Sequence, residues 1–302
     1  MEIMASCKLG YESRLQKLID YIYDHLNEPL DLMTMADVAG ISQYHLHRIY
    51  TSIYGESISN MIKRLRLHKA AGNLINTDMS INQAASLSGY RHLQSFTRAF
   101  SAEFGTPPAS FRQQRRNLGA EPMTLLTPYK VAREKRNMQD ANVNSTFSVS
   151  ISQLDTPIHM VVYPHQGSYM NIGQAFEKLS GWAGMRQLFD QTTRMMAVYF
   201  HDPDNTPEAE LRSLAGITLT PEKVPNLEAP LEHYDIQSGN YAVLRYKGPY
   251  ADMHRAYKWF FGTWLAESGY EVADQPPFEE YLNDPRQVAP NDLLTDIYMP
   301  LK

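Results

Sequence analysis

A helix–glycine–helix pattern occurs twice in the first third of the chain. The second copy begins at Ser80, a residue type that caps helix N-termini, and a short amphipathic helix follows it. Gly89 supplies a turn, and a second helix is predicted from about His92 to Phe104, because apolar side chains recur there at three- and four-residue steps. Two short helices joined by a glycine turn are typical of a helix-turn-helix unit. The predicted apolar faces are Ile81, Ala84, Ala85 and Leu87 on the first helix and Leu93, Phe96, Phe100 and Phe104 on the second.

The first copy of the pattern lies about 50 residues earlier, between residues 36 and 55. Asp31 is expected to cap its first helix, Leu32–Ala39, and Ser42 to cap its second helix, Gln43–Tyr54. A long helix, Ser57–Asn76, separates the copies, and a helix over residues 11–27 precedes them. A helix of about 20 residues spans roughly 30 Å, close to one turn of B-DNA. The spacing therefore lets two recognition helices enter successive major grooves.

Residues of about 11–116 resemble the DNA-binding domain of the AraC/XylS family of bacterial transcription regulators. The motif that carries the resemblance is long and gapped: Arg66-Leu67, Ala70, Leu74-Ile75, Ile81, Ala84-Ala85, Ser88-Gly89-Tyr90, Phe96-Thr97-Arg98, Phe100, Phe104-Gly105-Thr106-Pro107 and Phe111-Arg112. The resemblance implies contacts with double-stranded promoter DNA.

Polar residues off the two apolar stripes are the candidates for these DNA contacts. Gln94, Ser95, Thr97 and Arg98 are types that reach base edges and phosphates. By resemblance, Tyr44, His47 and Arg48 stand where the family contacts bases, although Tyr44 has the alternative of packing on a neighbour. The full predicted set is Gln43, Tyr44, His47, Arg48, His92, Gln94, Ser95, Thr97 and Arg98.

The charge of the chain divides along its length. Residues 1–136 carry 17 Lys and Arg against 12 Asp and Glu, whereas residues 137–302 carry 11 against 21. A basic front joined to an acidic back fits a DNA-binding module attached to a part that does not touch DNA. At 302 residues the chain suits two or three domains. We predict a DNA-binding domain at 1–117, a basic linker at 118–146 and a further domain at 147–302.

The back domain is predicted to be α+β, which makes the chain a multidomain protein with an all-α front. Gln166-Gly167-Ser168-Tyr169 leads into an amphipathic helix, and Lys247-Gly248-Pro249-Tyr250 leads into another 81 residues later. Each half is predicted to run strand–helix–strand–strand. Two such halves can pair edge to edge and leave a cleft between them.

Residues 147–302 resemble the GyrI-like small-molecule-binding domain of multidrug-responsive regulators. Glu279 stands at the acid of the family's strand motif, Phe278-Glu279-Glu280-Tyr281, in which Glu279 and Tyr281 face away from Phe278 and Glu280. The resemblance implies an aromatic cleft with this acid at its base, suited to lipophilic cations. The alternative is that Glu279 is a solvated strand residue. The predicted lining is Glu279, Tyr281, Tyr163, Trp182, Tyr241, Trp259 and Tyr298, with Trp264 a further candidate, although most of these aromatics could equally be core.

The arrangement as a whole resembles Rob-type regulators, in which an AraC-type unit precedes a GyrI-like domain. We expect a DNA-binding transcription regulator that responds to a small effector, with RNA polymerase as a further partner. The alternatives for the back domain are a small-molecule hydrolase or a protein-binding module. No nucleophile–base constellation or phosphate-binding glycine loop is visible, so no enzymatic activity and no cofactor are predicted.

Three further features complete the expectations. The single cysteine, Cys7, cannot form an internal disulfide and favours a reduced cytoplasm. The expected location is cytoplasmic and nucleoid-associated. No stretch approaches a membrane span. His45 and His47 are two residues apart and do not share a helix face, so no metal site is predicted.

Overall fold

The computed structural model describes residues 2–117, 147–219 and 226–302. The predicted linker, 118–146, therefore lies outside the described residues. The described chain divides into two compact units. Unit 1 contains the described residues within 1–13, 40–53 and 142–302, and unit 2 contains those within 14–39 and 54–141. The segment 40–53, which carries the first predicted recognition helix, thus belongs to the same unit as the back domain.

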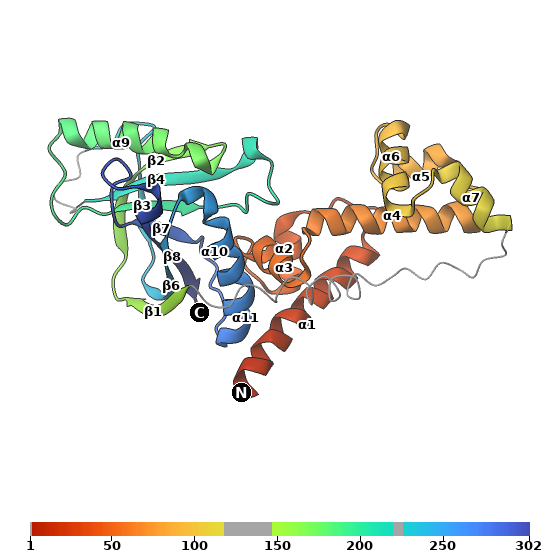
Figure 1. The fold of residues 1–302 in the computed structure, drawn as a ribbon, viewed down its shortest axis with the longest axis horizontal. Helices are drawn as coiled ribbons and strands as arrows, with labels where there is room; N and C mark the ends of the chain where they lie inside the picture. Colours follow the sequence, from red (N-terminus) through yellow and green to blue (C-terminus); the bar gives the residue numbers. More distant parts are fainter. Residues whose placement is uncertain (1, 118–146, 220–225) are drawn as a thin grey trace. The chain divides into compact units, whose positions relative to one another are not determined.

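Unit 2 is helical (Figure 1). The helices of the front half are α1 (Glu2–Asp24), α2 (Leu32–Ala39), α3 (Leu46–Tyr54), α4 (Ile58–Asn76), α5 (Ile81–Leu87), α6 (Leu93–Phe104) and α7 (Pro108–Asn117). Of these, α1 and α3 each cross from one unit to the other, and α2 and α4–α7 lie within unit 2. Helices α4, α5, α6 and α7 enclose an aromatic core around Phe96, Phe100 and Phe111.

Several of the predicted helix boundaries are confirmed. Asp31 accepts a hydrogen bond from the backbone N–H of Thr34 at 2.9 Å, as an N-cap does. Ser80 and Gln83 form a reciprocal capping box at the start of α5. Gly89 and Gly105 adopt φ values of 80° and 73°, the left-handed region that side chains with a Cβ resist.

Four local predictions were wrong. Helix α1 begins at Glu2 rather than at residue 11, and α3 begins at Leu46 rather than Gln43. Residues 43–45 form a turn instead, because the Ser42 carbonyl accepts hydrogen bonds from the N–H groups of both His45 and Leu46. Leu87 and Leu93 are 48% and 43% exposed. They flank the glycine turn, where the helix ends leave less surface to cover them than the helix centres do.

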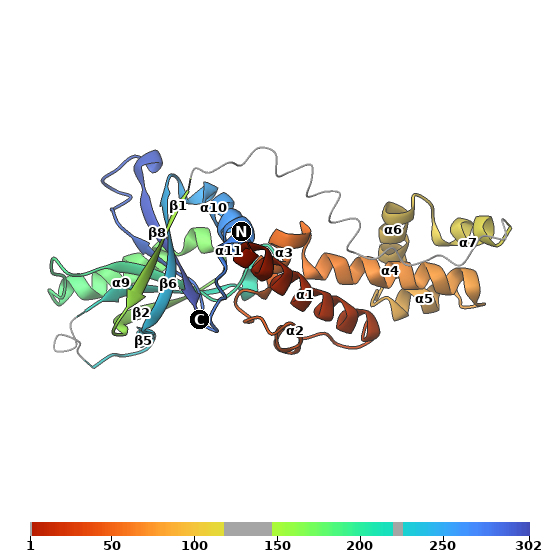
Figure 2. The ribbon, with the colours of Figure 1, turned by 90° about the horizontal axis from the view of Figure 1, so that it is seen from below.

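Unit 1 is built on one antiparallel sheet of eight strands (Figure 2). The strands are β1 (Ser148–Leu154), β2 (Ile158–Gln166), β3 (Met195–Tyr199), β4 (Arg212–Thr218), β5 (Glu232–Ile236), β6 (Gly239–Lys247), β7 (Phe278–Tyr281) and β8 (Leu294–Leu301), in the order β1-β6-β8-β7-β3-β4-β2-β5. The two halves of the domain meet where β3 pairs with β7, with Ala197 opposite Glu279. The predicted edge-to-edge pairing is therefore present, but each half contributes four strands, β1–β4 and β5–β8, rather than the predicted three.

Helix α9 (Gly173–Met185) packs on β2 and β4, with Leu179 and Ala183 against Val161 and Ile217. In the second half, α10 (His254–Trp259), a π-helical turn η6 (Phe260–Trp264) and α11 (Leu265–Ser268) follow one another without a break. Short 3₁₀ turns, η2 (Tyr169–Asn171) and η5 (Tyr250–Asp252), precede α9 and α10. Within the described residues, no helix is both long enough and apolar enough to cross a membrane.

Candidate functional site

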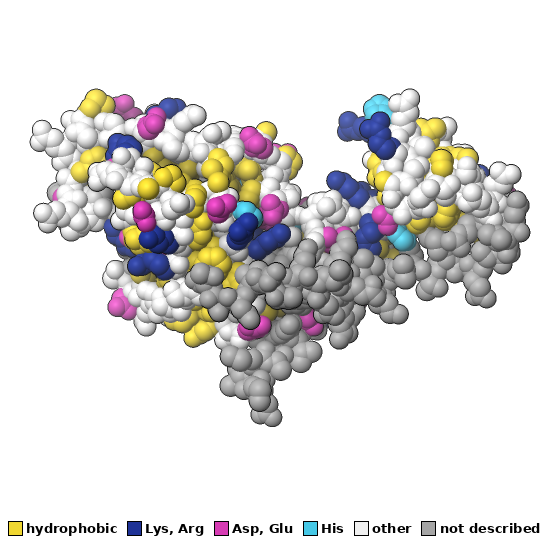
Figure 3. All heavy atoms as spheres, viewed as in Figure 1, with side chains coloured by type: hydrophobic (Ala, Val, Ile, Leu, Met, Phe, Trp, Pro, Cys, Tyr) yellow, Lys and Arg dark blue, Asp and Glu magenta, His cyan; other side chains and the backbone are white. Residues whose placement is uncertain are grey.

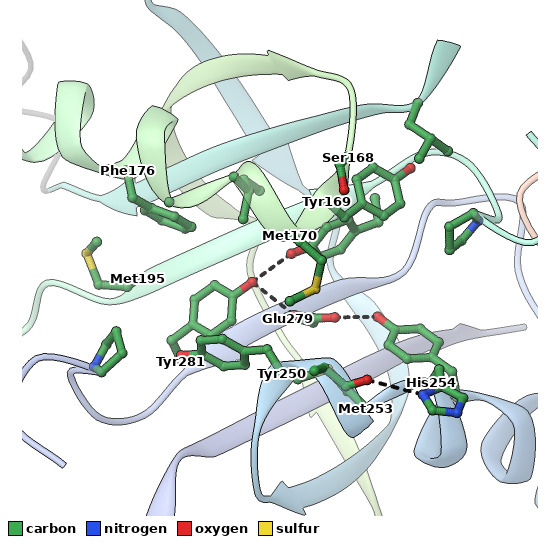
Figure 4. A pocket seen from close by; sticks show the side chains of 18 of the residues that line it. Ser168, Tyr169, Met170, Phe176, Met195, Tyr250, Met253, His254, Glu279 and Tyr281 are labelled. Carbon is green, nitrogen blue, oxygen red and sulfur yellow. Dashed lines mark hydrogen bonds between the residues drawn. The ribbon is translucent and has the colours of Figure 1, made fainter. Parts of the chain in front are cut away.

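A cavity of about 1240 Å³ opens in unit 1 where its two halves meet. Its wall comes from η2 and α9 in the first half and from η5 and α10 in the second, and β3 and β7 also contribute to it (Figure 4). The volume exceeds the roughly 300–1,000 Å³ typical of sites for drug-sized ligands. Its aromatic lining is Tyr169, Phe176, Phe189, Tyr199, Tyr250, Tyr257 and Tyr281, beside Met170, Met195, Met253 and Glu279.

Glu279 is the buried acid of this cavity, with 5% of its surface exposed. Tyr257 donates a hydrogen bond to Oε1 at 2.8 Å, and Tyr281 donates to Oε2 at 2.9 Å (Figure 4). The hydroxyls of Tyr199 and Tyr281 lie 2.7 Å apart. Because the single proton of Tyr281 goes to the carboxylate, Tyr199 must be the donor in that pair. One carboxylate thus orders three tyrosine side chains.

The protonation of these groups follows from their burial. Burial raises the pKa of Glu279, while the hydrogen bonds from Tyr257 and Tyr281 and the nearby charge of Arg48 act to lower it. Burial, together with the charge of Glu279, holds the pKa of Tyr199, Tyr257 and Tyr281 well above the usual value, so these phenols stay protonated as donors.

The alternation of β7 puts Glu279 and Tyr281 on one face of the sheet, as predicted. Phe278 lies on the other face, where its ring stacks on that of Tyr298 at 4.3 Å. Glu280 shares that face, and its Oε1 accepts a hydrogen bond from Arg194 Nε at 2.7 Å. The two neighbouring glutamates therefore differ in kind, because only Glu280 has a cationic side chain hydrogen-bonded to it.

Of the seven predicted ligand residues, Glu279 and Tyr281 line the cavity. Tyr241 and Tyr298 pack in the core on the opposite face of the sheet. Tyr163 and Trp182 pack at the α9 side, against the cluster that contains Leu179. Trp259 contacts Phe147 at 5.5 Å between ring centroids, and Trp264 packs on Phe260. None of these six aromatics is in the cavity wall.

The aromatics that do line the cavity carry a signal in the sequence. Tyr169 and Tyr250 are 81 residues apart, Phe176 and Tyr257 are also 81 apart, and Tyr199 and Tyr281 are 82 apart. These are the offsets of the internal similarity between the two halves. Residues at matching offsets approach the same interface when two halves pair edge to edge, so the offset predicts this lining better than aromatic character alone does.

The predicted DNA-contacting residues divide into two groups. On the second helix-turn-helix, the exposed residues are His92, Gln94, Ser95 and Arg98, and Thr97 is half-buried. Lys and Arg side chains gather over α6 and the adjoining part of α4 in Figure 3. This surface is open to a polyanion.

The predicted DNA-contacting residues of the first helix-turn-helix instead make contacts within unit 1 of the fold. Arg48 is only 8% exposed, and its guanidinium donates to the carbonyl oxygens of Tyr44 at 3.1 Å and His201 at 2.8 Å. His47, Gln43 and Tyr44 are half-buried, and the Tyr44 ring lies 6.4 Å from that of Phe200. The alternative of Tyr44 packing on a neighbour is therefore the one observed.

Fold and site define a class: a double helix-turn-helix protein with an attached domain that holds an acidic, tyrosine-lined cavity. The GyrI-like small molecule binding domain family matches residues 147–302, more than half of the chain, and a helix-turn-helix domain family matches residues 35–114. The chain therefore belongs to the GyrI-like small molecule binding domain family. It joins this domain to an N-terminal AraC-type helix-turn-helix domain, which makes it a DNA-binding transcription regulator of the AraC class.

Named relatives each match part of the chain. The probable transcription factor PqrA of Proteus vulgaris is 37% identical over 87 residues, which cover 29% of this chain and 71% of the relative. The DNA gyrase inhibitor of Enterobacter lignolyticus is 32% identical over 117 residues, which cover 38% of this chain and 73% of the relative. The HTH-type transcriptional regulator YbfP of Bacillus subtilis is 33% identical over 102 residues, and the match spans 34% of this chain and only 35% of that protein.

The burial of His45 predicts how the unfolding free energy of the chain depends on pH. It is fully buried, Nε2 donates to the carbonyl oxygen of Gln275 at 2.9 Å, and Nδ1 has no partner in the described structure. Burial, with the neighbouring charge of Arg48, lowers the pKa of His45 from 6.5 to about 3. The unfolded chain therefore binds more protons than the folded one as pH falls below about 6.5, and stability falls with it.

Between about pH 7.5 and pH 5.5 the wild-type chain should lose on the order of 1 kcal/mol more unfolding free energy than His45→Gln, which lacks the titrating ring. Denaturant unfolding at both pH values measures this difference. Equal pH dependence of the two proteins would contradict the assignment of a neutral, buried His45.

Glu279→Gln should destabilise the domain. The amide oxygen can accept only from one side, so either Tyr257 or Tyr281 faces an NH₂ group that cannot accept its hydrogen bond. The expected loss is about 1–3 kcal/mol of unfolding free energy. Thermal unfolding of the variant measures it, and a midpoint equal to or above that of the wild type would contradict the hydrogen-bond network.

Proposed function

We propose that the chain binds promoter DNA through its two helix-turn-helix units and that a small effector binds in the cavity at Glu279. The observation that carries the effector half of the proposal is a buried carboxylate, ordered by Tyr257 and Tyr281, in a large aromatic cavity. The observation that supports the DNA half is an exposed recognition helix, α6, with Gln94, Ser95 and Arg98 on its open face.

The effector class that fits this cavity is a lipophilic cation. Taking a carboxylate out of water is costly unless charges of opposite sign accompany it, and a cationic ligand would add such a charge inside the cavity. The faces of Tyr250, Tyr257 and Phe176 add attraction for a cation held over a ring. Three methionines in the wall, Met170, Met195 and Met253, can adapt to ligands of different shape.

A regulator of this kind acts where DNA and RNA polymerase are, so we propose both as partners and a cytoplasmic, nucleoid-associated location. The hydrolase alternative gains no support from the cavity, because Glu279 already accepts two hydrogen bonds and its tyrosine neighbours stay protonated, which makes them poor nucleophiles.

Arg98→Ala should weaken DNA binding. Arg98 projects from the exposed face of α6 and is free to contact a guanine edge or a phosphate. A bidentate contact with guanine would make the loss about 1–3 kcal/mol, whereas a phosphate contact would reduce affinity similarly on all sequences and lower the salt dependence. Fluorescence anisotropy with a duplex selected from a random-sequence pool, at several salt concentrations, distinguishes the two.

Glu103→Ala is the matched control for Arg98→Ala. It shortens a charged side chain of the same helix that bonds to His68. If Arg98→Ala and Glu103→Ala both bind the selected duplex as the wild type does, α6 is not a recognition helix.

Glu279→Gln should weaken the binding of lipophilic cations. The change removes the negative charge and keeps the shape, so the affinity for tetraphenylphosphonium should fall at least tenfold, or about 1.4 kcal/mol. Calorimetric titration of the full chain measures this. Tetraphenylmethane-type neutral compounds of the same shape should show no such loss, and Glu232→Gln, an exposed glutamate on β5, is the matched control variant. Equal cation affinity in all three proteins would contradict a cation site at Glu279.

A further inference from the structure

The first recognition helix contributes a wall to the effector cavity. Arg48, Thr51 and Ser52 of α3 line the same space as Glu279 and Tyr257, and all five residues belong to unit 1. Neither the double helix-turn-helix nor the GyrI-like domain requires this on its own. A side chain expected to read DNA and a carboxylate expected to hold the effector therefore lie in one cavity.

Arg48 occupies the position in which a cationic ligand would be expected. Its guanidinium carbon lies 5.5 Å from the ring centroids of both Tyr257 and Phe261. These two rings are parallel, with an interplanar angle of 1°. Tyr257 in turn donates to Glu279, so one aromatic side chain links the cation of α3 to the buried acid. This is the geometry of an aromatic cage with its cation already present.

The contact of α3 with the rest of unit 1 is close. A Cβ added at Gly262, in the π-helical turn η6, would lie 2.7 Å from the Cβ of Ser52. Only a glycine at this position lets the two helices approach as they do. Further polar contacts hold the segment: Ser42 donates to Asp274 at 2.8 Å, and Asn205 donates to Thr51 at 3.3 Å.

The same contact is incompletely satisfied. Buried Nδ1 atoms of His45 and His47 and the buried Oδ1 of Asn205 have no hydrogen-bond partner in the described structure. Each such atom would find a partner in water if α3 moved away. A contact with strong anchors and unpaired buried atoms is suited to release, whereas a permanent core is not.

We propose that Arg48 is an internal cation that holds the first recognition helix in the cavity, and that a lipophilic cation binds by taking its place over Tyr257. The displaced Arg48 and α3 then become available to DNA. The inference rests on the proposed effector site and adds the mechanism by which that site would control DNA binding. The proposed role also explains why the guanidinium of Arg48, unlike that of Arg98, donates hydrogen bonds to carbonyl oxygens.

Thermodynamic linkage gives the signs of the expected effects. If cation and DNA each favour the released α3, each must raise the affinity for the other by the same factor. Removing the Arg48 guanidinium vacates the cage without touching Glu279. Hence Arg48→Ala should bind tetraphenylphosphonium more tightly than the wild type in the absence of DNA, by about fivefold or more, the lower end of typical couplings.

Calorimetric titration of the full chain tests this first consequence, with Arg98→Ala as the matched control because it removes the same side chain from the other recognition helix. Tighter cation binding by Arg48→Ala alone supports the proposal. Equal or weaker binding by Arg48→Ala, while the wild type does bind the cation, overturns this inference and leaves the effector site intact. No cation binding by the wild type overturns both.

Gly262→Ala tests the second consequence through DNA. The added methyl cannot coexist with the Ser52 Cβ in the docked arrangement, so α3 should be released without a ligand. This variant should bind the selected duplex about fivefold or more tightly than the wild type in the absence of cation, and saturating tetraphenylphosphonium should no longer raise its affinity.

Two further variants make the DNA test specific. Gly184→Ala adds the same methyl to α9, where no atom lies within 4 Å of the new Cβ, and should behave as the wild type. The double variant Gly262→Ala/Ser52→Gly removes the clash and should recover the response to cation. Wild-type DNA affinity and response in Gly262→Ala, with thermal stability unchanged, would overturn the proposal; so would a double variant that binds DNA as Gly262→Ala does.

Discussion

A buried carboxylate is the constraint on which the back domain depends. Glu279 is 5% exposed, and its two oxygens are satisfied by hydroxyls that come from different elements: Tyr257 from α10 and Tyr281 from β7. Tyr199 on β3 continues the chain of hydrogen bonds. A buried acid without hydrogen-bond partners would be costly, so these elements must hold their positions to keep both of its oxygens satisfied. The shape of the cavity follows from that requirement.

The sheet makes this arrangement possible, because β3 and β7 are neighbours at its centre. Glu279 and Tyr281 project from β7, Tyr199 projects from β3, and the turns that start α9 and α10 place Tyr169 and Tyr250 over them. Each half of the domain contributes similar residues to one space. Neither half could form the cavity alone, since each supplies only part of the wall.

Much of the fold could be predicted from local physical chemistry. Part of the site could not, and the reason can be identified. The glycine turns and the capping residues Asp31 and Ser80 predict the helices, because their effects act within one turn of helix. Alternation along β7 predicts the faces of Glu279 and Tyr281. Most of the predicted aromatic lining was wrong, because Tyr241 and Trp182 are of the same residue types as could line a cavity. They differ from the cavity residues only in which layer of the fold covers them.

The engagement of Arg48 could not be predicted from its own segment for a related reason. Spacing along α3 places Arg48 off the apolar stripe, a position that predicts exposure, and this holds for Arg98 on α6. The partners that bury Arg48 are more than 150 residues away, at His201 and Tyr257. A trace of this contact in the sequence is Gly262, a glycine inside a helical segment, where glycine costs stability but allows a close approach to Ser52. A glycine inside a helix therefore indicates that another element packs closely against the helix at that position. In this chain the element is the helix expected to read DNA, so the same close packing that completes the cavity also buries Arg48.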